Sequence, residues 1–145
     1  MTMIRKVAIR GFKSIYSATL ELGRLNCFIG ANGVGKSNLL EALGVLGAAA
    51  NGVVDDESLL RRGVRAGLPR LYKSSFATEH TPTHISIGVE GEAHEAYRVA
   101  LLNPLESPEP AWSYKTEFLS DGQKKSSLKG FATRKTSTKK LDSPP

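Results

Sequence analysis

A glycine-rich loop that ends in lysine and serine constrains this chain more than any other feature. Residues 30–37 read Gly-Ala-Asn-Gly-Val-Gly-Lys-Ser, which matches the pattern G-x-x-x-x-G-K-[ST] at every fixed position. Glycines let the backbone turn tightly and point successive N–H groups at phosphate oxygens. Because such a loop works between a strand and a helix, the motif predicts an α/β chain with a phosphate-binding turn at a strand-to-helix junction.

The sequence on both sides of the loop has the pattern that this junction needs. Residues 25–29 (Leu-Asn-Cys-Phe-Ile) form a short apolar run, which predicts a buried strand. Leucines then recur at helical spacing, and they predict a helix from Lys36 to about Ala50 that Asn51 and Gly52 end. The loop therefore lies where a strand gives way to a helix.

Two side chains at the end of the loop carry the predicted chemistry. Lys36 can reach the β- and γ-phosphates of a nucleotide, and the hydroxyl of Ser37 is the expected ligand of Mg²⁺. The N-terminus of the following helix adds its partial positive charge at the same place. A glycine-rich turn with a purely structural role would require neither Lys36 nor Ser37, so the sequence favours nucleotide binding.

Elsewhere the chain alternates apolar and polar residues in several segments. This alternation predicts strands at residues 3–10, 17–22, 84–90, 93–102 and 112–119, with a hairpin link at Gly91 and Glu92. Residues 55–62 predict a short helix, because acids stand at its start and arginines at its end. The segment 51–83 shows no other clear pattern.

The positive charge of the chain is concentrated near its C-terminal end. The 145 residues carry a net charge of +6, and residues 115–145 hold eight Lys and Arg against three acids. Residues 123–145 are rich in Lys, Ser and Thr, a composition that need not fold by itself. A nucleic-acid-binding module acting through this basic tail is one alternative function, although Phe131 is its single aromatic residue for stacking on bases.

Residues 10–15 (Arg-Gly-Phe-Lys-Ser-Ile) and 25–43 together resemble the N-terminal segment of SMC/RecF-like ATPases. These proteins are ABC-type heads, and they include OLD-like and AAA-family ATPases of bacteria. The shared features are a G-F-K-S turn after the first strand, the loop G-x-N-G-x-G-K-S-N, and an acidic residue early in the following helix. The resemblance is strong over residues 3–47, moderate over 84–119 and absent after about 122.

This resemblance implies a fold and a division of the chain. The fold is α/β: a fragment of a P-loop NTPase head of the ABC type, with a mixed sheet, an antiparallel β lobe and a disordered or irregular basic tail. Residues 1–122 are expected to form the N-terminal part of the ATPase domain, and residues 123–145 the tail.

The resemblance also implies ATP and Mg²⁺ as cofactors. Phosphate contacts are expected from the loop, a Mg²⁺ contact from Ser37, and further proximity to the nucleotide from Asn38 and Lys13. An exposed lysine on a turn is the alternative interpretation of Lys13, and Phe12 is expected in the core. The full set of expected cofactor-binding residues is Gly30, Ala31, Asn32, Gly33, Val34, Gly35, Lys36, Ser37, Asn38 and Lys13.

The machinery for hydrolysis is not recognisable in the sequence. An ATPase of this type also needs an aliphatic strand that ends in Asp and a Glu that orients the attacking water. Residues 53–56 (Val-Val-Asp-Asp) are better interpreted as a helix start, and residues 119–123 (Leu-Ser-Asp-Gly-Gln) as a hairpin turn rather than an ABC signature. ATP hydrolysis by this chain alone is therefore expected to be incomplete.

The resemblance points to DNA-linked work: DNA repair, DNA maintenance or phage defence. Expected partners are ATP, DNA, and a second ATPase head in a homodimer or on a partner subunit. No apolar run is long enough to cross a membrane and no secretory signal is visible, so we expect a cytoplasmic location without membrane contact. A different P-loop kinase or NTPase is the remaining alternative, and the absence of an N-K-x-D run disfavours a GTPase.

Other reactive residues give weaker signals. His80 and His84 are separated by Pro82 and have no third ligand nearby, which disfavours a metal site. Cys27 is expected to pack in the buried strand, and His94 is expected to have a structural role within a strand.

Overall fold

The computed structural model describes residues 2–65, 72, 84–104, 107–123 and 125–128, and the statements below refer to these residues. Six strands and two helices follow each other along the chain. They are β1 (Ile4–Phe12), β2 (Ile15–Glu21), α1 (Lys36–Ala50), α2 (Asp56–Leu60), β3 (Ile85–Gly91), β4 (Glu95–Leu102), β5 (Ser113–Asp121) and β6 (Lys125–Leu128).

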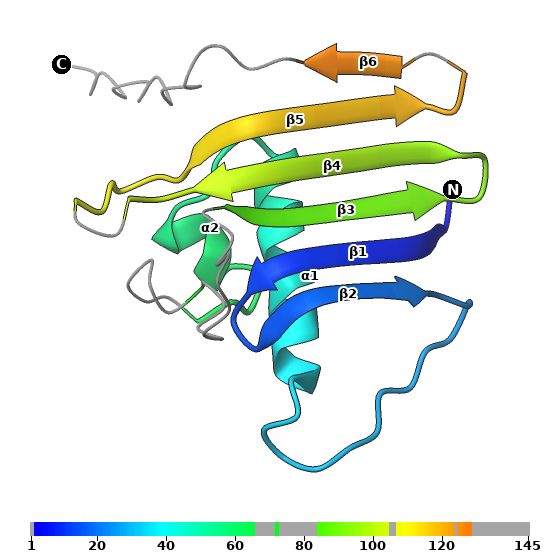
Figure 1. Cartoon of the computed structure of the whole chain (residues 1–145), viewed down its shortest axis with the longest axis horizontal. Helices are drawn as coiled ribbons and strands as arrows, with labels where there is room; N and C mark the ends of the chain where they lie inside the picture. The colour runs from blue at the N-terminus through cyan, green and yellow to red at the C-terminus, as the bar shows by residue number, and fades with distance from the viewer. Residues whose placement is uncertain (1, 66–71, 73–83, 105–106, 124, 129–145) are drawn as a thin grey trace, which may run out of the picture.

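The strands form one sheet in the order β2-β1-β3-β4-β5-β6 (Figure 1). Every pair of neighbouring strands is antiparallel. Most neighbours are joined by short hairpins, whereas β1 and β3 are far apart in the sequence and pair with Val7 opposite Val89 and Ile9 opposite Ile87. Both helices belong to the long connection between β2 and β3, so this central pairing closes the fold around them.

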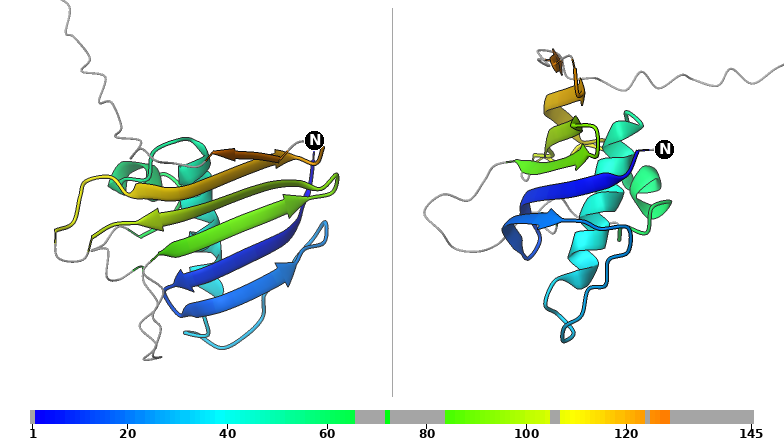
Figure 2. Two further views of the ribbon diagram at one scale, coloured as in Figure 1. Left: turned by 45° about the horizontal axis from the view of Figure 1, so that its top comes forward. Right: turned by 90° about the vertical axis from the view of Figure 1, so that its right-hand side faces the viewer.

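Helix α1 covers one face of the sheet, as both views of Figure 2 show. Alternation along the strands turns their apolar side chains to this face, among them Val7 and Ile9 of β1 and Ile87 of β3, which are all at most 2% exposed. The helix faces them with Leu39, Ala42, Val45, Leu46, Ala48 and Ala49, all buried. Each large apolar side chain buried here contributes about 1.5–3 kcal/mol of transfer free energy. This helix–sheet layer is the core.

The helix is also held at its C-terminal end. The hydroxyl of Tyr114 in β5 donates to the carbonyl of Ala49 at 2.9 Å. The segment that follows α2 packs against α1 at Gly44, where an added Cβ would lie 2.5 Å from Val64 Cγ2. A glycine is therefore required at this close approach. These contacts fix the direction of α1, and hence the place where it begins, at the phosphate loop.

Most of the predicted elements are confirmed. Helix α1 has the predicted bounds, α2 lies within the predicted segment 55–62, and the hairpin of β3 and β4 and the strand β5 lie where expected. Phe12 is fully buried, as predicted. The turn between β3 and β4 is longer than expected, so His94 lies in it and not in a strand.

Two predictions about the sheet are wrong. Residues 25–29 form no strand, and Leu25 and Ile29 are 91% and 90% exposed. The sheet is consequently antiparallel throughout the described residues, not mixed. Both errors have the same physical reason. An apolar run becomes a buried strand only where neighbouring strands satisfy its backbone N–H and C=O groups. In the part of the chain that the structure describes, no such neighbour flanks residues 25–29.

The described C-terminal residues form a turn and one more strand. Asp121 and Gly122 form the predicted hairpin turn, and Gly122 has a φ of 87°. Residues 125–128 then pair with β5 as β6, so the prediction of an irregular tail from residue 123 is wrong for this strand. Residues 129–145 lie outside the described residues. No helix in the described part of the chain has the length and apolar character that crossing a membrane requires.

Candidate phosphate-binding loop

The loop of residues 30–37 leads directly into α1, at the end of the helix that projects beyond the sheet (Figure 1). Gly33 and Gly35 have φ values of 86° and 100°, a left-handed region that costs other residues energy. Residues 30–34 are exposed. The two glycines therefore give the loop its tight turn, and its backbone is open to a ligand from solvent.

Lys36 lies within the loop that it ends. Its Nζ donates to the carbonyl of Gly30 at 2.5 Å and to that of Ala31 at 2.7 Å. The ammonium group is thus held at the mouth of the loop by two backbone acceptors, which draw the first residues of the loop around it. A cation held in this way attracts phosphate oxygens.

The N-terminus of α1 carries positive partial charge that the described residues do not neutralise. Its N-cap is Gly35, which has no side chain to accept from the first N–H groups, and no acidic residue stands in the first turn. By contrast α2 is capped by Asp55, whose carboxylate accepts from the backbone N–H of Ser58 at 2.8 Å. The start of α1 therefore leaves its N–H groups available to an anion, whereas at the start of α2 a protein carboxylate already occupies that place.

The remaining predicted site residues lie on both sides of this helix end. Ser37 is exposed in the first turn of α1. The side-chain amide of Asn38 donates to Ser14 Oγ at 2.6 Å. Lys13 forms an ion pair with Glu41 of α1, and its side chain is only 15% exposed, so the alternative interpretation of an exposed turn lysine is wrong.

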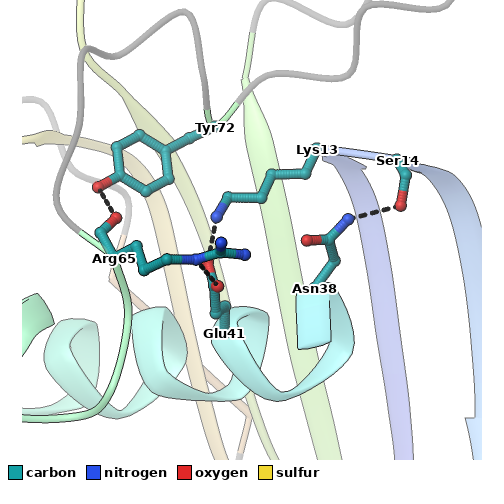
Figure 3. A network of polar contacts seen from close by, with 6 residues as sticks. All are labelled: Lys13, Ser14, Asn38, Glu41, Arg65 and Tyr72. Carbon is teal, nitrogen blue, oxygen red and sulfur yellow. Dashed lines mark hydrogen bonds and ion pairs between the residues drawn. The ribbon is translucent and has the colours of Figure 1, made fainter. Parts of the chain in front are cut away.

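Sequence reasoning did not single out Glu41 as a site residue. It is 5% exposed and is the single charged residue that is buried among the described residues. Its carboxylate pairs with Lys13 and also accepts from Arg65 Nε at 3.1 Å, as Figure 3 shows. Its position five residues after Lys36, on the face of α1 that carries buried Ala42 and Val45, was the signal that could have found it.

Other candidate residues lie elsewhere. The Asp55 carboxylate is used as the cap of α2, which agrees with the interpretation of residues 53–56 as a helix start. Cys27 is exposed, so the expectation that it packs in a buried strand is wrong. His84 lies 3.4 Å from Lys115 Nζ through its Nδ1, while His80 lies outside the described residues.

Comparison with known proteins matches residues 3–84 to the AAA ATPase domain family. This match spans β1, β2, the phosphate loop and both helices, which is more than half of the chain. The chain belongs to this family. A nucleotide-binding ATPase domain is what that membership implies, usually with Mg²⁺.

Two relatives refine the assignment. The DNA replication and repair protein RecF of Phocaeicola vulgatus is 34% identical over 64 residues, and RecF of Renibacterium salmoninarum is 39% identical over 69 residues. The matched segments cover 42% and 46% of this chain but 17% of each relative. The expected resemblance to SMC/RecF-like ABC-type ATPases is confirmed, and the chain corresponds to about a sixth of the length of these curated relatives.

Proposed function

We propose that this chain binds ATP with Mg²⁺ through residues 30–38, as the phosphate-binding part of an ATPase of the RecF/SMC class. The loop N–H groups and the start of α1 would receive the phosphates, Lys36 would neutralise their outer charge, and Ser37 would hold Mg²⁺. The observation that carries the proposal is the end of α1. It has an uncapped helix N-terminus, two glycines with positive φ, and Lys36 held by the carbonyls of Gly30 and Ala31.

Binding of ATP to the whole chain tests this proposal. Calorimetric titration with MgATP is expected to give a dissociation constant that Lys36→Ala raises by about 10- to 150-fold, because a charge-assisted contact contributes about 1.5–3 kcal/mol. Ser37→Ala is expected to remove most of the dependence on Mg²⁺. Equal affinities of the wild type and Lys36→Ala would reject the assignment of the phosphate loop.

The class of nucleotide can be decided in the same titration. The sequence lacks a guanine-specifying N-K-x-D run, so we expect ATP to bind at least as tightly as GTP. A clear preference for GTP would favour a different P-loop NTPase, and transfer of the γ-phosphate to a small molecule would favour a kinase.

We infer that hydrolysis needs residues that this chain does not supply by itself. Apart from residues 53–57, which start α2, no aliphatic run that ends in Asp-Glu occurs in the sequence. Such residues hold Mg²⁺ and orient water in ATPases of this type. A second ATPase head, either another copy or a partner subunit, would bring two nucleotide sites together. Slow or absent turnover by the isolated chain, despite tight binding, is the expected result.

A DNA-linked role in the cytoplasm is the wider proposal, and the names of the two RecF relatives support the link to DNA. The basic residues beyond Leu128 offer a route for phosphate contacts, and the single cysteine fits a reducing compartment. Truncation after Leu128 keeps β6 intact. If DNA affinity and its salt dependence are unchanged by this truncation, the tail is not the DNA contact.

A further inference from the structure

The turn between β1 and β2 carries a lysine at a position that favours glycine. Lys13 has a φ of 48°, and its backbone N–H donates to the carbonyl of Tyr72 at 2.8 Å. A residue with a side chain is unfavourable in this left-handed region, and strained positions of this kind are concentrated at functional sites. Glycine would fit this backbone conformation better. We therefore look for a role of Lys13 in the contacts of its side chain.

The side chain of Lys13 makes a largely buried contact with α1. Lys13 Nζ forms an ion pair with Glu41, whose side chain is 6% exposed. The same ammonium lies 5.6 Å from the ring centroid of Phe12 and 5.3 Å from that of Tyr72, within the range of cation–π contacts. Removing one partner of such a pair leaves the other charge buried and poorly compensated. Lys13 and Glu41 therefore hold the turn and the helix together as a unit.

The neighbouring residue extends this contact to the phosphate loop. A Cβ placed on Gly35 would lie 3.0 Å from Ser14 Oγ, so the hydroxyl touches the last glycine of the loop. Ser14 Oγ also accepts from the Asn38 amide at 2.6 Å. Figure 3 shows the two links side by side, with Lys13 and Ser14 on the turn and Asn38 and Glu41 on successive turns of α1. The turn thus contacts the helix start at three points.

We propose that Lys13, Ser14, Asn38 and Glu41 are positioning residues for phosphate binding, which brace the Gly35 end of the loop against the turn between β1 and β2. This inference rests on the proposed function, since the loop must bind phosphate for its position to matter. It assigns to Lys13 an action through Glu41 and to Asn38 an action through Ser14. The family resemblance instead implies that both lie close to the nucleotide. The loop needs such a brace because residues 25–29, on its other side, pair with no strand in the described structure.

A double-mutant cycle separates the two roles of Lys13. The variants are Lys13→Met, Glu41→Gln and the double variant of the whole chain, each titrated with MgATP. If Lys13 acts through Glu41, each single variant weakens binding by about tenfold, and the double variant is no weaker than the weaker single one. If Lys13 touches the nucleotide itself, its loss adds to that of Glu41, and the double variant weakens binding by about a hundredfold. Additive losses, or unchanged dissociation constants, would overturn the proposal.

Arg65→Met is the matched control for the carboxylate. Arg65 is the second partner of Glu41, but its side chain is 76% exposed and its pairing is screened by water. We expect less than about a twofold change in the dissociation constant for this variant. A loss as large as that of Lys13→Met would mean that the charge on Glu41, and not its link to the turn, controls binding.

A nucleotide-free measurement keeps this inference separate from the proposed function. Amide hydrogen exchange at residues 39–42, the first amides bonded within α1, is expected to be faster in Ser14→Ala and in Lys13→Met than in the wild type, and unchanged in Arg65→Met. Ser14→Ala leaves no buried charge unpaired, so it tests the brace even if Glu41→Gln fails to fold. If the wild type does not bind MgATP, the proposed function fails. Unchanged exchange at residues 39–42 in both variants would overturn the brace itself.

Discussion

The sheet with α1 and the segment that leads into the phosphate loop differ in two respects. Within the described residues, the sheet has paired backbone groups and buried apolar side chains, whereas the segment has neither. Strand β3 pairs on both sides, and its Ile85 and Ile87 are 4% and 2% exposed against α1. Residues 25–29 have a similar apolar composition, yet they form no strand and expose Ile29 almost completely. The difference is in hydrogen-bonding neighbours and not in the residues themselves.

This contrast separates a part of the molecule that is packed by its own contacts from a dependent segment, whose exposed groups need a ligand or a further partner to be satisfied. The antiparallel sheet, with its inner face under α1, closes on itself through local hairpins and one central pairing. The loop instead presents apolar side chains, glycines with positive φ and an uncapped helix end to solvent. The first part should respond to substitutions as a packed core does, and the second should respond mainly to its ligand.

The largest expected difference is between two isoleucines. Ile87→Ala removes a side chain buried under α1 and is expected to lower the free energy of unfolding by about 3 kcal/mol, as large-to-small core substitutions do. Ile29→Ala removes a side chain that is 90% exposed, so its cost should lie within about 0.5 kcal/mol. Urea unfolding followed by circular dichroism measures both. Comparable costs would mean that residues 25–29 are packed after all.

Two glycines of α1 provide the next test, because their neighbours differ. Gly44→Ala would bring a Cβ to 2.5 Å from Val64 Cγ2 and 3.1 Å from the Arg62 carbonyl oxygen. At Gly47 the nearest atoms belong to the flexible Arg62 side chain, at 3.2 Å and 3.4 Å. Alanine gains about 1 kcal/mol over glycine in a helix interior, and overpacking costs about 1–3 kcal/mol.

We therefore expect Gly44→Ala to destabilise the chain by up to about 2 kcal/mol, and Gly47→Ala to be neutral or stabilising by up to about 1 kcal/mol. Thermal unfolding of the two variants under one set of conditions compares them directly. Stabilisation by both would show that Arg62 and Val64 do not pack closely on α1.

Removal of the cap of α2 is expected to have a smaller effect on the free energy of unfolding, and none on nucleotide binding at the start of α1. Asp55 accepts from Ser58 N–H, and the Ser58 hydroxyl closes the capping box by accepting from Asp55 N–H. Asp55→Ala is expected to cost about 1 kcal/mol of unfolding free energy. The dissociation constant for MgATP should stay the same, because this carboxylate is used by α2 and not by the loop. Weaker binding in this variant, at unchanged stability, would instead give Asp55 a role at the phosphate site.

The same contrast explains what could be predicted from the sequence. Local signals were sufficient where the structure is local: the leucine spacing of α1, the acids that start α2, and the turn at Asp121 and Gly122. They failed for residues 25–29, since an apolar run does not reveal whether neighbouring strands exist. They also missed Glu41, because its partners Lys13 and Arg65 are 28 and 24 residues away along the chain and are brought to it by packing.

The smallest energetic effect, and a direct test of the dependent segment, concerns Cys27. A thiol in a buried strand reacts only through opening of the structure, which slows its labelling tenfold for each 1.4 kcal/mol of opening free energy. Cys27 is exposed, so labelling of the native chain by a thiol reagent should proceed on the order of the rate seen in urea, within about tenfold. Cys27→Ser should change the free energy of unfolding by less than about 0.5 kcal/mol. If labelling is instead strongly protected in the native chain, and Cys27→Ser is costly, residues 25–29 are buried in solution. The contrast with the sheet would then be lost, since a second copy or another part of the chain would be covering the segment.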